Sequence, residues 1–96
     1  MRQEADALGA TALPEGSLYG VHTVRAVANF PVSGQVVAPE LLTAFAWVKA
    51  ACALANQDAG HLDASRASAI VAACREIAAG RHAEQFPVDA LQGGAG

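Results

Sequence analysis

The chain has 96 residues and a formal net charge of −3, with six basic residues against nine acidic ones. This length allows one domain at most, and the few basic residues exclude a nucleic-acid-binding or membrane-surface protein, because both need a basic face or run. Alanine supplies 24 of the residues, which favours helices and leaves few large side chains for a core. We expect such a core to be marginal alone and to need a further surface to pack against.

Neither a targeting segment nor a membrane-spanning segment is predicted. Residues 1–10 carry acids and lack an apolar stretch, unlike a secretory signal. The most apolar region, residues 41–55, is shorter than a bilayer span and contains Lys49. Cys52 and Cys74 lack a CxxC spacing and are interpreted as core thiols of a reduced compartment. We therefore predict a cytoplasmic protein.

A mainly α fold with four successive parts is predicted. They are an extended arm over 1–18, a short helix and loop over 19–38, an antiparallel helical hairpin over 39–80, and a glycine-rich loop over 81–96. In the arm, Leu8 and Leu13 flank a Gly-Ala-Thr-Ala segment that is compatible with a small extended hairpin.

The short helix is predicted over residues 23–29, with His22 or Thr23 capping its first N–H groups. Arg25 and Asn29 are four residues apart, so both side chains can be presented to one partner. A solvated or carbonyl-capping arginine is the alternative for Arg25.

Local signals define the two helices of the hairpin. Pro39 suits a first helical position, Gly60 ends the first helix, Asp63 caps the second, with Ser65 as a weaker alternative, and Gly80 ends it. The short link implies antiparallel helices. The residues expected to be buried recur at steps of three and four: Leu41, Phe45, Val48, Cys52 and Ala55 in the first helix, and Ala67, Ile70, Val71, Cys74, Ile77 and Ala78 in the second.

The end of the chain has two interpretations. Four of its last five residues are Gly or Ala, which is typical of a flexible terminus and also of a backbone that approaches a ligand closely. A phosphate-binding loop is disfavoured because no Gly-Lys-Ser/Thr follows. No metal site or cofactor is predicted, since the histidines and cysteines lack ligand spacing; these residues are His22, His61, His82, Cys52 and Cys74.

Two motifs go beyond these general features. The pattern Y-G-x-x-T-x-R-A-x-x-N-F begins at Tyr19, and F-P-V-D-x-x-Q-G-G-A-G begins at Phe86. Together they resemble the aspartase/fumarase superfamily of homotetrameric lyases, which add or remove a small group across the double bond of fumarate. The resemblance implies that residues 1–96 are an incomplete N-terminal domain of such a lyase. His22 and Ala95 stand where class II fumarases usually carry glutamine and serine, which favours an aspartate ammonia-lyase; a fumarase-like hydratase is the alternative.

The resemblance also implies which site residues this chain carries. Gly94, Ala95 and Gly96 would border the pocket for a small dicarboxylate, and Arg25 and His22 would lie near it. Arg25 either supports the site or forms an interior ion pair, and a structural hydrogen bond is favoured for His22. The family's catalytic segments lie further along the polypeptide, so no catalytic residue is assigned here and the 96-residue chain is predicted to be inactive alone.

A small helical interaction module without catalytic function is the remaining alternative. It would explain the alanine-rich hairpin equally well but not the two motifs. The lyase interpretation predicts exposed apolar surface around Trp47.

Overall fold

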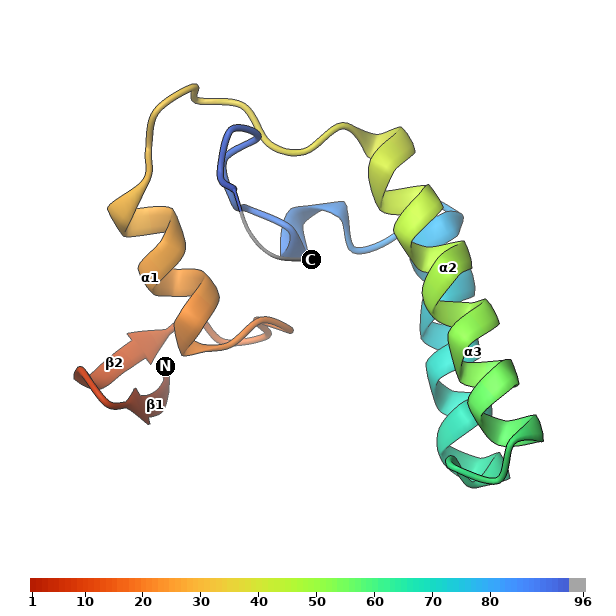
Figure 1. The fold of residues 1–96 in the computed structure, drawn as a ribbon. Helices are drawn as coiled ribbons and strands as arrows, with labels where there is room; N and C mark the ends of the chain where they lie inside the picture. Colours follow the sequence, from red (N-terminus) through yellow and green to blue (C-terminus); the bar gives the residue numbers. More distant parts are fainter. Residues whose placement is uncertain (94–96) are drawn as a thin grey trace. The chain divides into compact units, whose positions relative to one another are not determined.

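A computed structural model describes residues 1–93 of the chain (Figure 1). The chain divides into two compact units, of which the first comprises Met1–Val37 with the segment that begins at Glu84, and the second comprises Ala38–Ala83. Three α-helices and one two-stranded sheet are found in the described part, so the prediction of a mainly helical chain is confirmed. Among residues 1–93, none of the helices combines the length and apolar character that a bilayer span requires.

The first unit begins with a β-hairpin. Strands β1 (Arg2–Asp6) and β2 (Gly9–Leu13) pair antiparallel, with Arg2 opposite Leu13 and Asp6 opposite Gly9. At the turn the Asp6 carboxylate accepts a hydrogen bond from the Leu8 N–H at 2.9 Å, while Gly9 has φ +118°, a backbone conformation that glycine adopts without strain. The predicted hairpin in the arm is therefore confirmed, but the Gly-Ala-Thr-Ala segment lies within one strand and not across the turn.

Helix α1 (Val21–Asn29) contacts both strands of the hairpin. It starts two residues before the predicted position, and neither His22 nor Thr23 caps it. Gly20 is the N-cap residue and supplies no side-chain hydrogen bond; the Glu4 carboxylate of β1 instead accepts from the Val21 N–H at 3.0 Å. The predicted cap was wrong because a side chain distant in the sequence fills that role.

The second unit is the predicted helical hairpin, in which α2 (Pro39–Asp58) and α3 (Ala64–Ala78) run antiparallel side by side (Figure 1). Pro39 is at the start of α2. Gly60 has φ +79° and follows the last turn, where its N–H and that of His61 bond the Gln57 and Asn56 carbonyls at 3.0 and 2.9 Å, as in a Schellman motif.

The start and end of α3 also follow the sequence signals. The Asp63 carboxylate accepts from the Arg66 N–H at 2.8 Å, as an N-cap residue does. Gly80, with φ +88°, follows the last turn of α3. The local signals for both helices are thus confirmed.

Small side chains form the contact between α2 and α3. Ala46, Ala50 and Cys74 are buried together, and Val71, Ile77 and Ala78 pack against them. The predicted burial of the larger residues on α2 was wrong, because the alanine face lets the helix backbones approach and takes the contact with α3. The larger side chains remain about half exposed: Leu41 (48%), Phe45 (49%) and Val48 (58%). Cys52 is exposed as well, and so is Trp47, as expected.

After α3 the chain forms a short 3₁₀ helix, η1 (Ala83–Gln85), which was not predicted. The Gln85 side chain accepts a hydrogen bond from the Leu18 N–H at 2.8 Å. An isolated antiparallel bridge pairs Val36 with Asp89. These contacts connect the final segment to the residues on either side of α1 within the first unit.

Candidate functional site

The start of α1 is fixed by polar side chains of β1. The Arg2 guanidinium donates to the carbonyls of Ser17 and Tyr19 at 2.8 and 2.9 Å. A Cβ at Gly20 would lie 2.9 Å from the nearer Glu4 carboxylate oxygen, so glycine leaves room for the carboxylate that bonds the helix start. The glycine of the first motif is therefore explained by the space that the Glu4 carboxylate needs beside Gly20.

Arg25 anchors α1 to the turn of the β-hairpin. Its Nε and one terminal nitrogen donate to the two carboxylate oxygens of Asp6 at 2.8 and 3.0 Å, and the same terminal nitrogen donates to the Gly9 carbonyl at 2.9 Å. This two-point geometry is typical of strong arginine–carboxylate pairs. The side-chain hydrogen bond from Arg25 holds the pKa of Asp6 below its usual value. The ion pair that was one of the two interpretations of Arg25 is therefore present.

His22 lies on the same side of α1 but makes no hydrogen bond within the described part of the chain. Its ring nitrogen Nδ1 is 3.9 Å from the Asp6 carboxylate, and its side chain is 89% exposed. The structural hydrogen bond favoured for His22 is absent among residues 1–93, and its imidazole faces solvent.

An open groove of about 510 Å³ gathers residues from the hairpin turn, from α1 and from the final segment. We call it the Arg25 groove. Its lining consists of Asp6, Ala7, Leu8, His22, Arg25, Ala26, Asn29, Phe30 and Gln92. Two predicted site residues, Arg25 and His22, thus line one concavity. The other three, Gly94, Ala95 and Gly96, lie outside the described residues, and Gln92 is the lining residue nearest to them in sequence.

The chemistry of the Arg25 groove suits binding better than proton transfer. Within residues 1–93, one terminal nitrogen of Arg25 has no hydrogen-bond partner, and neither do the side chains of Asn29 and Gln92. Guanidinium and amide N–H groups are the donors that carboxylates accept. Asp6 is the carboxylate in the groove, but its pairing with Arg25 makes it a weak base. Among the described residues, no group of three or more His, Cys, Asp or Glu is placed to hold a metal ion.

A second polar cluster is centred on Asp89. Its residues are close in sequence to residues that line the Arg25 groove, and the cluster was not predicted from the sequence. The Asp89 residue is 8% exposed, and its carboxylate accepts four hydrogen bonds: from Val32 N–H (3.0 Å), Ser33 N–H (2.7 Å), Ser33 Oγ–H (2.8 Å) and Leu91 N–H (2.9 Å). We call this set the Asp89 clasp. The Leu91 N–H first, and the Ser33 and Val32 donors with it, lower the pKa of Asp89 to about 2 although burial acts in the opposite direction.

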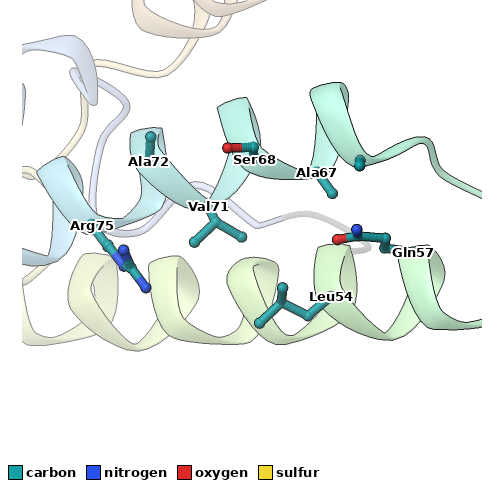
Figure 2. Close-up of a pocket in the computed structure, with 8 residues that line it drawn as sticks. Leu54, Gln57, Ala67, Ser68, Val71, Ala72 and Arg75 are labelled. Carbon is teal, nitrogen blue, oxygen red and sulfur yellow. The ribbon is translucent and has the colours of Figure 1, made fainter.

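The α2–α3 hairpin carries a separate open groove of about 460 Å³, shown in Figure 2. Leu54 and Gln57 line it from α2, and α3 contributes mostly small side chains together with Arg75. Of the described residues that were predicted to be functional, Arg25 and His22, neither lines it. Its lining is mostly apolar, and the polar side chains of Gln57, Ser68 and Arg75 do not form a reactive arrangement.

Comparison with known proteins places this chain in a family. A family model described as "Lyase" matches residues 9–96, nearly the whole chain. The chain belongs to this lyase family. The fumarate hydratase class II of Corynebacterium efficiens is 45% identical over 95 residues, which are 99% of this chain and 20% of that protein. An aspartate ammonia-lyase of a Bacillus species is 44% identical over 96 residues, which are 100% of this chain and 20% of that protein.

Solved structures show the same relationship for this lyase-family chain. The crystal structure of a fumarate lyase:delta crystallin from Brucella melitensis matches with a TM-score of 0.91 and 44% identity, covering 100% of this chain and 22% of that one. A class II fumarase from Schistosoma mansoni matches with a TM-score of 0.87 and 31% identity, covering 95% and 19%. This chain therefore spans about a fifth of the length of the relatives that it matches.

Some of the residues in the two clusters could be recognised from the sequence and others could not. Arg25, His22 and Asp89 lie in the two motifs. Nothing marked Asp6 or Glu4, because their partners are far away in the chain and the hairpin alone brings them to α1. The conspicuous arginine was therefore found from the sequence and its carboxylate partner was not.

Proposed function

We propose that this chain forms part of the active site of a lyase that produces fumarate by anti elimination, with L-aspartate as the substrate and ammonia as the leaving group. The observation that carries the proposal is the grouping of Arg25, His22 and Gln92 in one groove of a chain that belongs to a lyase family. The relative from the Bacillus species, an aspartate ammonia-lyase, supports the choice of substrate.

In this reaction a base first removes the proton from the carbon next to a carboxylate, and the electron pair left behind is shared with that carboxylate in an enediolate-like intermediate. The pair then forms the double bond as the C–N bond breaks and ammonia leaves. The intermediate places additional negative charge on the carboxylate, which preorganised donors stabilise. Asn29, Gln92 and the terminal nitrogen of Arg25 that has no partner within residues 1–93 are the donors that we assign to a carboxylate of the substrate. The Asp6 carboxylate keeps the guanidinium in a fixed orientation.

The proton-abstracting base is not assigned to this chain. Asp6 is held ionised and paired, and Asp89 has all its acceptor positions filled, so neither suits the role. We propose accordingly that the 96-residue chain alone is inactive. The active enzyme in this proposal is a homotetramer that acts in the cytoplasm.

A second candidate reaction is the hydration of fumarate to malate. It is supported by the class II fumarate hydratase of Corynebacterium efficiens and by the class II fumarase from Schistosoma mansoni. Both reactions share fumarate and a four-carbon dicarboxylate framework. They differ in whether ammonia or water adds to the double bond.

The test is a pair of chimeric enzymes in which this chain replaces the matching segment of the Bacillus aspartate ammonia-lyase or of the Corynebacterium fumarate hydratase. Fumarate is followed by its ultraviolet absorbance with aspartate and with malate as substrates. We expect the first chimera to deaminate aspartate and Arg25→Gln to lower its kcat/KM, whereas the exposed Arg66→Gln, as the matched control, leaves it unchanged. Folded tetramers without activity would refute the lyase role, and activity of the second chimera alone would favour the hydratase.

A further inference from the structure

The Asp89 clasp joins two segments that are far apart in the sequence. Val32 and Ser33 follow α1, and Asp89 lies 57 and 56 residues later, beyond η1. A carboxylate has about four acceptor positions, and all four hydrogen bonds to Asp89 lie between 2.7 and 3.0 Å. The carboxylate is therefore saturated by its own chain and does not itself contact a ligand.

Two backbone hydrogen bonds accompany the Asp89 clasp, one to the loop after α1 and one within the final segment. The Ala90 N–H donates to the Gln35 carbonyl at 2.8 Å, and the Gln92 N–H donates to the Asp89 carbonyl at 2.9 Å. The bond between Ala90 and Gln35 belongs to the isolated antiparallel bridge that pairs Val36 with Asp89. The turn over residues 89–92 is thus closed on itself, attached to the loop after α1, and ended by Gln92 in the lining of the Arg25 groove.

We propose that Asp89 is a positioning residue, whose carboxylate fixes the turn over residues 89–92 so that Gln92 faces the Arg25 groove. This inference rests on the proposed function, because Gln92 is there assigned to a substrate carboxylate. Asp89 acts through the position of Gln92 and not by touching substrate.

The arrangement of the four donors makes Asp89→Asn a sharp test. One carboxylate oxygen accepts from the two backbone N–H groups of Val32 and Ser33, and the other accepts from the Ser33 hydroxyl and the Leu91 N–H. An Asn side chain must turn its NH₂ group toward one of these pairs. The hydroxyl can rotate to accept from it, whereas backbone N–H groups cannot. Asp89→Asn therefore keeps the bonds to Val32 and Ser33 and loses the bond to Leu91.

The first measurement uses the 96-residue chain itself and follows amide hydrogen exchange by NMR. In Asp89→Asn we expect exchange at Leu91 and Gln92 to rise by about tenfold or more, as for the loss of one hydrogen bond to a charged group, with β1 and β2 unchanged. Asp58→Asn is the matched control, because Asp58 forms no ion pair within the described residues and the charge change is the same. Unchanged exchange at Leu91 and Gln92, or faster exchange throughout the β-hairpin as well, would overturn the positioning role.

The second measurement uses the chimeric lyase and a double-mutant cycle. Asp89→Asn is expected to lower kcat/KM by up to about 100-fold, the effect of a displacement near 1 Å in a binding group. Gln92→Ala is expected to lower kcat/KM as well, and the double variant should lose no more than the stronger single variant, because one residue acts through the other. Additive losses, or full activity in Asp89→Asn, would contradict the inference. An inactive unsubstituted chimera would refute the proposed function, while the exchange measurement would still decide the role of Asp89.

Discussion

Leu13 is the residue on which the first unit should depend most strongly. Among the described residues it is the largest side chain that is fully buried, with 0% exposure at the end of β2. Truncation of a buried leucine to alanine removes its transfer free energy and leaves a cavity, at a combined cost of about 2–5 kcal/mol. Folded domains have only about 0.05–0.15 kcal/mol of stability per residue. Leu13→Ala should therefore remove much of the stability of the unit formed by Met1–Val37 and the final segment.

Leu8→Ala provides the matched control, since Leu8 is 77% exposed at the turn of the same hairpin. The same truncation there should change the free energy of unfolding by no more than about 0.5 kcal/mol. Amide exchange in β1 and β2, measured under native conditions, reports the opening free energy of the hairpin for both variants. Equal exchange in Leu13→Ala and Leu8→Ala would refute the assignment of Leu13 as the centre of this unit.

Three further predictions concern single features of the two units. Asp63→Ala should destabilise α3 by about 1 kcal/mol through loss of its N-cap, as measured by urea denaturation followed by circular dichroism. Cys52 is exposed and Cys74 buried, so a thiol reagent should modify Cys52 in the native chain and Cys74 only after unfolding. The pKa of Asp6 is lowered by its hydrogen bond from Arg25, so its contribution to stability is present above the ordinary pKa of 3.8 and is lost as the pH falls below that value.

Each of these predictions has a specific contradiction. Ser65→Ala, at the neighbouring alternative cap position, should leave the stability of α3 nearly unchanged, and an equal loss in both variants would argue against the Asp63 cap. Equal labelling of the two thiols in the native chain would contradict their different burial. Arg25→Gln should reduce the dependence of stability on pH in the acid range, and an unchanged dependence would show that Arg25 does not lower the pKa of Asp6.

The ends of α2 and α3 could be read from the sequence because each depends on local chemistry. Pro39, Gly60 and Asp63 act on the backbone within a few residues of themselves. The ion pair of Arg25 with Asp6 depends instead on a hairpin that returns the chain across 19 residues. No local pattern encodes such a partner, and the Glu4 carboxylate at the start of α1 was missed for the same reason.

The buried face of α2 could not be predicted because its sequence offers two faces with the same spacing. Leu41, Phe45 and Val48 recur at steps of four and three, and so do Ala46, Ala50 and Ala53, of which only the latter are buried. Periodicity identifies a helix but does not decide which of two apolar faces meets its neighbour. The contact with α3 favours the smaller residues.

The alanine face gives α2 two very different tolerances to change. A methyl group at Ala50 already fills its place between the two helices, where the residue is only 5% exposed, so a larger side chain would force α2 and α3 apart. At the neighbouring exposed positions of α2, the volume of the side chain can vary without disturbing the contact with α3. A saturation library along α2 should therefore separate strict from permissive positions, and the strict ones would be the buried alanines Ala46, Ala50 and Ala53.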